Sequence, residues 1–170
     1  PSFDDVIKGI LENDEHAHIL MIRYNKIEDK IKKRLRKKIT AKDFERIEFK
    51  LTFKRRDYFS ALQHADVCLE TFPFGGGNTV LHAMAAGTPM ITLKGTSLRS
   101  SFGTAFYNYI KKPSFIANSV AEYINLAVTV ANDKSVKQSF QLLIKKNKHK
   151  LFNNMDGVNE FYDWLKQTLK

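Results

Sequence analysis

The sequence predicts an α/β protein in which helices cover both faces of a parallel, doubly wound β-sheet. Short apolar segments of strand length alternate with amphipathic segments of helical length, about every 20 residues. Connections between such parallel strands are right-handed crossovers. With 170 residues, the chain is expected to form one domain that is closed by helices at its C-terminal end.

The first third predicts two helices and two strands. Ser2 and Asp5 have the spacing of a capping box, which predicts a helix that ends near Asn13. The continuous apolar run 17–22 predicts a buried parallel strand. The strict alternation of apolar and polar residues over 46–53 predicts the second strand. Between the strands, one helix is indicated by an apolar residue at every fourth position, namely Ile27, Ile31, Leu35 and Ile39.

The middle third repeats this alternation around a glycine loop. A short helix is expected over 56–64 and a strand over 66–69. After the loop, a helix is expected over 78–86, and Gly87 is placed to end it in the left-handed conformation. The apolar segment 89–93 predicts the next strand.

The last third becomes increasingly helical. A helix is expected to end at about residue 110, and a short strand follows over 114–117. Ser119 and Glu122 again have capping-box spacing and predict the start of another helix. The remainder, from Asp133 onwards, predicts two or three helical pieces that close the domain.

The charge balance is basic, with 28 Lys and Arg against 18 Asp and Glu and a formal net charge of +10. This balance suits an anionic ligand, an anionic membrane surface or nucleic acid. Seven of the nine residues in 30–38 are basic, and the simplest interpretation is a solvated helix face. A membrane surface or nucleic acid is the alternative partner of this basic helix. No aromatic residue interleaves with these charges, which argues against binding of single-stranded nucleic acid.

Residue usage favours a cytoplasmic protein. Cys68 is the single cysteine, so an internal disulfide and a cysteine metal cluster are both excluded. No apolar stretch reaches the roughly 20 residues that a membrane-spanning helix needs. The first residues lack the basic start and apolar core of a signal peptide. The histidines show no metal-ligand spacing, and no metal site is predicted.

The loop Gly75, Gly76 and Gly77 leads directly into the predicted helix. Glycine lets a ligand approach the backbone closely, and the free amides of a first helical turn attract anions. Asn78 and Thr79 add side-chain donors at the same turn. The loop therefore predicts a phosphate site, most simply for the diphosphate of a nucleotide-sugar. The alternative is a tight strand-to-helix turn without ligand, in which Asn78 is a plain N-cap.

Three segments around this loop resemble the donor-binding half of the O-linked N-acetylglucosamine transferase family. They are ADVCLET at 65–71, FPFGGGNT at 72–79 and AGTPM at 86–90. The bacterial protein N-glucosyltransferases, which are cytoplasmic, share the motif. These enzymes have the GT-B architecture, in which two Rossmann-like domains face each other across a cleft and the C-terminal one holds UDP-sugar. The specific part of the resemblance is 65–97, and a looser likeness covers most of the chain.

The resemblance implies roles for several side chains. Asn78 and Thr79 match the family's donors to the UDP diphosphate, and Tyr58 matches a ring close to the nucleotide, where it would stack on uracil. Arg55 matches a basic position in the same segment. The simpler alternatives are that Tyr58 belongs to the rim of the core and that Arg55 belongs to a solvated helix start.

Two positions depart from the family pattern. His82 stands where the family has a carboxylate that hydrogen-bonds the ribose hydroxyls. A neutral histidine accepts a hydrogen bond at one nitrogen only, so ribose affinity and nucleotide identity are open, and partial burial is the alternative role. Ser101 stands where the family often has arginine, and Arg99 is a nearby replacement for that charge.

The implied function is an inverting, metal-independent transfer of a GlcNAc- or glucose-type sugar from UDP to a protein or glycan acceptor. The family's catalytic lysine lies just upstream of the first helix, before position 1. The chain is thus expected to lack its first strand and the N-terminal acceptor-side domain, and to be inactive alone. No catalytic residue is assigned within it. The alternative is a non-catalytic Rossmann-like module that binds nucleic acid or an anionic membrane through the basic helix.

Overall fold

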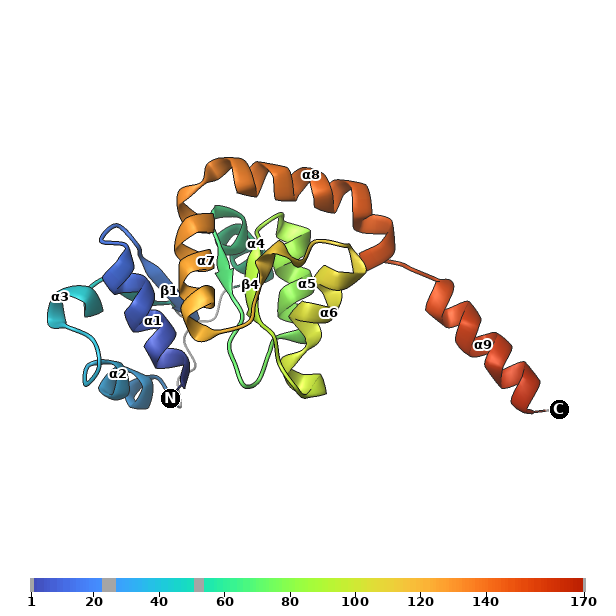
Figure 1. The fold of residues 1–170 in the computed structure, drawn as a ribbon, viewed down its shortest axis with the longest axis horizontal. Coiled ribbons are helices and arrows are strands. Elements are labelled where there is room, and N and C mark those ends of the chain that lie inside the picture. Colours follow the sequence, from blue (N-terminus) through green and yellow to red (C-terminus); the bar gives the residue numbers. More distant parts are fainter. Residues whose placement is uncertain (1, 23–26, 51–53, 170) are drawn as a thin grey trace.

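The computed structural model describes residues 2–22, 27–50 and 54–169 and confirms an α/β fold with parallel strands. In Figure 1, helices flank the central strands on both sides, α7 on one side and α5 and α6 on the other. The strands of the described part are β1 (Ile19–Ile22), β2 (Ile47–Lys50), β3 (Cys68–Leu69), β4 (Met90–Leu93) and β5 (Ile116–Ala117). Its α-helices are α1 (Ser2–Asn13), α2 (Glu28–Leu35), α3 (Ala41–Phe44), α4 (Arg55–His64), α5 (Gly77–Ala86), α6 (Phe102–Tyr109), α7 (Val120–Asn132), α8 (Lys134–Leu151) and α9 (Asp156–Thr168).

The strands form two parallel sheets instead of one continuous sheet. β1 pairs with β2, with Ile19 opposite Ile47, whereas β3, β4 and β5 form a second sheet in that order. Within the described ranges, β1 and β3 each have one edge without a partner strand. β1, β3, β4 and β5 are shorter than the segments that predicted them, and residues 51–53 of the second predicted strand lie outside the described residues.

The prediction of a buried first strand is wrong in part. The side chains of β1 alternate between half-buried and exposed, and Leu20 and Ile22 are 45 % and 48 % exposed. An apolar run is buried on both faces only when neighbours cover both faces and both edges of its strand. β1 lacks such cover on the side of these two residues.

The main core lies between the three-stranded sheet and the helices around it. Tyr107, Tyr123 and Phe140 are its largest fully buried side chains. Both tyrosine hydroxyls have partners, because Tyr107 Oη accepts from the Met90 amide at 2.8 Å and Tyr123 Oη donates to the Glu70 carbonyl at 3.0 Å. A second, smaller cluster packs α1 and α2 against β2, through Ile7, Leu11, Leu35, Ile39 and Ile47.

Most predicted helix boundaries are confirmed to within a residue or two. Gly87 ends α5 with φ of +76°, the left-handed conformation that glycine favours. The capping box expected at α7 is only half formed. Ser119 Oγ accepts from the Glu122 amide at 3.1 Å, but the Glu122 carboxylate accepts from the Asn118 amide instead of that of Ser119.

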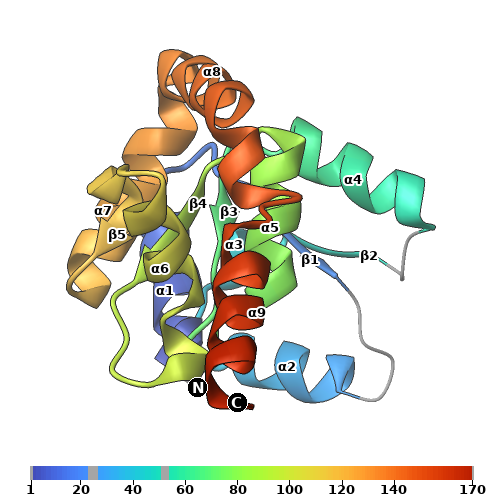
Figure 2. The ribbon, with the colours of Figure 1, turned by 90° about the vertical axis from the view of Figure 1, so that its right-hand side faces the viewer.

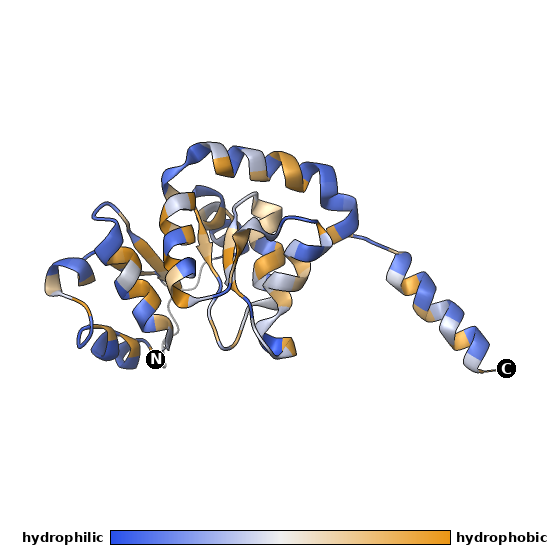
Figure 3. Ribbon diagram, viewed as in Figure 1, coloured by the Kyte–Doolittle hydropathy of each residue, from blue (hydrophilic) through white to orange (hydrophobic). Residues whose placement is uncertain are grey.

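The C-terminal segment forms two helices that differ in their packing. α8 crosses the top of the domain in Figure 1, whereas α9 projects away from it. In Figure 2, which is viewed from that side, α9 lies in front of the domain. Figure 3 shows hydrophobic residues on α9 although it stands apart from the body. Phe161, Tyr162 and Trp164 are 60 %, 55 % and 55 % exposed. The prediction of helices from Asp133 onwards is confirmed, but only α8 closes the domain.

Candidate functional site

The glycine loop connects the carboxyl end of β3 to the amino end of α5 (Figure 1). Two of its three glycine amides already bind protein acceptors. The Gly75 amide donates to the Arg99 carbonyl at 2.8 Å, and the Gly76 amide donates to Glu70 Oε1 at 3.0 Å. The amides that could bind an anion are therefore those that begin at Gly77, not those of the whole loop.

Packing explains two of the three glycines without any ligand. A Cβ atom on Gly75 would lie 2.7 Å from Glu70 Oε1, and one on Gly76 would lie 2.9 Å from the Thr79 Cβ. Both distances are too short for real contacts. A Cβ on Gly77 would only touch the Phe102 ring, at an ordinary 3.8 Å. The protein itself thus leaves room for a side chain at Gly77, beside the first turn of α5.

The amino end of α5 has no side-chain cap. Gly76 is the N-cap residue, and it has no side chain with which to accept from the first turn. Asn78 and Thr79 are the second and third residues of the helix, and both side chains are exposed. The interpretation of Asn78 as a plain N-cap is therefore wrong. First-turn amides that lack an acceptor carry partial positive charge and attract anions.

Two of the predicted site residues meet between α4 and α5. The Tyr58 and His82 rings lie edge to face with centroids 5.6 Å apart, and the Phe59 ring lies 5.2 Å from that of His82. Tyr58 is half-buried, and this burial raises the pKa of its hydroxyl. His82 is also half-buried, one turn beyond Asn78 on α5. Arg55, the first residue of α4, has an exposed side chain.

Arg99 lies in a short 3₁₀ turn (Leu98–Ser100) that precedes α6. Its carbonyl accepts from the Gly75 amide, and its side chain is exposed. Ser101 donates from its hydroxyl to the Ser97 carbonyl at 2.8 Å, so it serves to shape this turn. The structure therefore joins Arg99 to the loop through backbone atoms, while Tyr58 and His82 form a separate pair on α4 and α5.

The residue that holds this region together was not among the predicted site residues. Glu70, at the end of β3, is only 4 % exposed. Its carboxylate accepts from the Gly76 amide, the Thr92 hydroxyl and the Gly103 amide. Burial raises the pKa of Glu70, and these three hydrogen bonds to the carboxylate oppose that rise. The sequence does carry a signal for Glu70. It is a carboxylate between an apolar strand and a glycine loop, and charged residues are seldom fully buried.

Acidic neighbours partly neutralise the basic helix. Arg34 binds the buried Asp4 carboxylate through Nε at 2.5 Å and Nη2 at 3.0 Å. Lys38 pairs with Asp5 at 2.6 Å, and Lys32 pairs with Glu28. The Arg34 and Lys38 pairs join the basic segment to α1, whereas the Lys32–Glu28 pair lies within α2.

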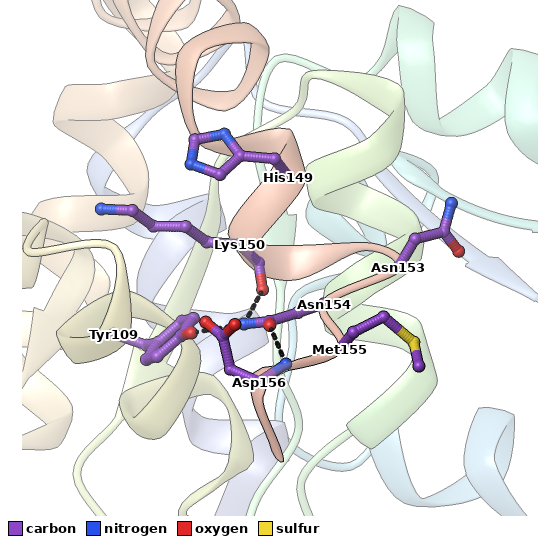
Figure 4. Close-up of a pocket in the computed structure, with 7 residues that line it drawn as sticks. All are labelled: Tyr109, His149, Lys150, Asn153, Asn154, Met155 and Asp156. Carbon is purple, nitrogen blue, oxygen red and sulfur yellow. Dashed lines mark hydrogen bonds between the residues drawn. The ribbon is translucent and has the colours of Figure 1, made fainter. Parts of the chain in front are cut away.

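A surface pocket lies elsewhere, where α8 passes into α9 (Figure 4). Asn154 bridges it, because its side-chain amide donates to the Tyr109 hydroxyl at 2.7 Å and to the Lys150 carbonyl at 3.4 Å. Its oxygen accepts from the Asp156 amide at 2.8 Å, at the start of α9. None of the predicted site residues lines this pocket, and its bonds serve to set the course of the chain between α8 and α9.

The described residues contain neither a candidate metal site nor a candidate membrane span. No group of three or more His, Cys, Asp or Glu residues in the ranges that the structure covers is arranged to hold a metal ion. No helix within those same ranges is both long and apolar enough to cross a membrane.

Comparisons with known proteins agree with this fold and motif. A UDP-N-acetylglucosamine–peptide N-acetylglucosaminyltransferase of Caenorhabditis elegans is 30 % identical over 134 residues, which are 78 % of this chain and 12 % of that protein. A probable SPINDLY enzyme of the same description, from Eustoma exaltatum subsp. russellianum, is 25 % identical over 95 residues, which are 56 % of this chain and 10 % of that protein. The chain thus spans about a tenth of the length of these relatives.

A solved structure and a family model extend the match to nearly the whole chain. The K341M mutant of Thermobaculum terrenum O-GlcNAc transferase superposes with a TM-score of 0.82 at 20 % identity, over 99 % of this chain and 32 % of that one. The sequence model described as Glycosyl transferase family 41 matches residues 3–160. The chain belongs to glycosyl transferase family 41.

Proposed function

We propose that this chain is the donor-binding half of an inverting glycosyltransferase that transfers a GlcNAc- or glucose-type sugar from UDP to a protein or glycan acceptor. The uncapped amino end of α5 carries the proposal, because it presents first-turn amides beside Gly77 together with the exposed Asn78 and Thr79. The family supports the reaction class, and so does the description of the two relatives as N-acetylglucosaminyltransferases that use UDP-N-acetylglucosamine.

The proposed contribution of this donor-binding half to catalysis is electrostatic. Negative charge develops on the departing UDP, and donors that already point at its phosphates stabilise the transition state more than the ground state. The α5 amides, Asn78 and Thr79 would supply neutral donors. Arg55 and Arg99, whose side chains are both exposed, would supply positive charge. In this arrangement the reaction needs no metal ion.

We place the nucleoside end of the donor at α4. Tyr58 would lie against uracil, and His82 would face the ribose from the next helix. The contact between the two rings supports a shared site, because both belong to the face where α4 and α5 pack. The carboxylate that the family uses for ribose is absent at this position, so we expect weaker selection for ribose than for phosphate.

We further propose that turnover requires an N-terminal GT-B half. The matched enzyme is about three times as long as the part that this chain covers. Two surfaces support the proposal: the open side of β1 with Leu20 and Ile22, and the apolar residues of α9. A first strand would cover the open side of β1, and the N-terminal half would cover α9.

Titration with UDP, GDP and a short DNA duplex, at two salt concentrations, tests the proposal. We expect micromolar binding of UDP, weaker binding of GDP, and a UDP affinity that falls less steeply with salt than duplex binding does. Binding of the duplex with a steep salt dependence and no binding of UDP would instead support the nucleic-acid module. Sedimentation with anionic vesicles, in the presence and absence of UDP, tests the membrane alternative. Binding to the vesicles without any binding of UDP would support that alternative.

A further inference from the structure

Glu70 lies where three segments of the candidate site meet. Its carboxylate accepts from Gly76 in the glycine loop, from Thr92 in β4 and from Gly103 in the first turn of α6. Its carbonyl accepts from the Tyr123 hydroxyl at 3.0 Å, from α7 on the other side of the sheet. Main chain and side chain are therefore both held, so the position of the carboxylate is fixed relative to the sheet.

The surroundings of Glu70 are shaped for a carboxylate. A Cβ atom on Gly75 would lie 2.7 Å from Oε1, and one on Gly103 would lie 2.3 Å from Oε2. Glycine at both positions lets the two peptides approach the carboxylate directly. A methionine of similar size could fill the space, but it would leave the Gly76 and Gly103 amides without an acceptor. Packing alone thus gives no reason for a buried charge here.

We propose that Glu70 is a positioning residue for donor binding, which acts through the peptides of Gly76 and Gly103. By holding the Gly76 amide, it sets the direction of the next peptide and of the uncapped first turn of α5. By holding the Gly103 amide, it fixes the start of α6. It thereby also fixes the preceding turn, which contains Arg99. The second tie between these segments is the hydrogen bond from the Gly75 amide to the Arg99 carbonyl. The inference rests on the proposed function.

The Glu70→Gln variant tests this role with almost no change of volume. A glutamine side chain has one oxygen and one NH₂ group, and the NH₂ group donates only. Whichever way the amide is turned, the Gly76 or the Gly103 amide meets a donor and loses its acceptor. The first turn of α5, where the phosphates are proposed to bind, should therefore become less well fixed. Tyr58 and His82 on α4 and α5 should keep their contact.

The experiment compares the affinities of the full-length protein for UDP and for uridine, which lacks the phosphates. UDP is measured by titration calorimetry and uridine by ligand-observed NMR. We expect Glu70→Gln to weaken UDP binding roughly tenfold and to leave uridine binding unchanged. Thr92→Val is the matched control. It removes one hydrogen bond from the same carboxylate but leaves the Gly76 and Gly103 amides bound to it. It should lower the Tm and leave the ratio of the two affinities unchanged.

Each outcome separates the two proposals. If the wild-type protein binds UDP, and Glu70→Gln leaves that affinity unchanged or lowers UDP and uridine binding equally, then the role of Glu70 is refuted while the proposed function stands. If the wild-type protein does not bind UDP, the proposed function fails first. Should Glu70→Gln not fold, Glu70→Asp carries the same test, because it keeps the charge but is too short to reach both peptides.

Discussion

The rings of Tyr58 and His82 meet edge to face, with their centroids 5.6 Å apart, where α4 packs on α5. The Phe59 ring completes the contact at 5.2 Å from His82. His82 thus combines a packing role with a place one helical turn beyond Asn78. The ring contacts show that the histidine packs at a position where relatives of this sequence are expected to have a carboxylate.

Replacement of His82 by aspartate should separate the two roles. We expect His82→Asp to lower the free energy of unfolding by about 1–2 kcal/mol, because it removes two edge-to-face aromatic contacts. The same change should increase the preference for UDP over 2′-deoxy-UDP, because a carboxylate can accept from both ribose hydroxyls. Urea unfolding and competitive titration measure the two effects.

His64→Asp is the matched control, since His64 is exposed at the end of α4. It should change neither quantity by as much. An unchanged ratio of UDP to 2′-deoxy-UDP affinity in His82→Asp would show that this side chain does not face the ribose.

Two glycines in helices should respond to alanine in opposite directions. In Gly103→Ala the new Cβ would lie 2.3 Å from Glu70 Oε2 and 2.8 Å from Thr92 Oγ1, so we expect a loss of about 1–3 kcal/mol in the free energy of unfolding. Gly157, in α9, has no atom within 4 Å of its ideal Cβ. Gly157→Ala should stabilise the helix by up to about 1 kcal/mol. Urea unfolding of both variants checks the contrast, and equal stabilities would contradict the packing around Glu70.

The Asp4–Arg34 pair should make stability depend on pH. Burial of Asp4 raises its pKa, but the two hydrogen bonds and the charge of Arg34 outweigh burial and lower the pKa below 3.8. A lowered pKa in the folded state adds stability above pH 3.8, and this stability is lost as the pH falls through the folded-state pKa. Asp4→Asn should therefore cost about 1–3 kcal/mol at pH 7 and much less near pH 2.

Urea unfolding at pH 7, 5 and 2 measures this dependence. Asp5→Asn serves as the control, because Asp5 also pairs with a basic residue of this segment, Lys38, but its side chain is 57 % exposed. Its cost at pH 7 should be smaller, because an exposed ion pair contributes little to stability. A constant difference between wild type and Asp4→Asn at all three pH values would refute the ionised pair.

Helix α9 should be protected from hydrogen exchange only when an N-terminal half is present. It has 13 residues, a length at which an isolated helix is marginal in water. Helix α7 also has 13 residues but includes the buried Tyr123, Ala127 and Val130, so it is a control of equal length. We expect α7 to be protected in this chain and in an enzyme that carries the upstream half, and α9 to be protected only in the latter.

Exchange of α9 at the same rate in both proteins would show that its apolar residues dock elsewhere. The variant Phe161→Ser with Trp164→Ser adds a second test. It should leave the Tm of this chain almost unchanged, since both side chains are more than half exposed. It should also abolish the extra protection in the longer protein.

Local signals predicted most of the fold. The spacing of apolar residues identified α1, and the glycine at position 87 marked the end of α5. The short helix α3 was missed although its N-cap signal is present, since Thr40 Oγ1 accepts from the Asp43 amide at 3.1 Å. The exposure of Leu20 and Ile22 could not be predicted, because an apolar run does not show which other elements cover the faces of its strand.

The candidate site was predicted in its parts but not in its connections. The motif identified the glycine loop, and the step from Asn78 to His82 placed both on one face of α5. The role of Glu70 depends on amides from two segments, Gly76 and Gly103, that lie far apart in the sequence and meet only in the fold. The contact between Arg99 and Gly75 could not be predicted either. It uses the backbone carbonyl of Arg99, a group that every residue has.

The central claim is that the amino end of α5 binds the diphosphate of UDP, and one calorimetric comparison tests it most directly. UDP is titrated into the wild-type protein, Asn78→Ala and Asn108→Ala, the last of which removes an exposed asparagine from α6. We predict micromolar UDP binding in the wild type and in Asn108→Ala, and a loss of about tenfold or more in Asn78→Ala. Equal UDP affinities in all three proteins, or no UDP binding by the wild type, would contradict the claim.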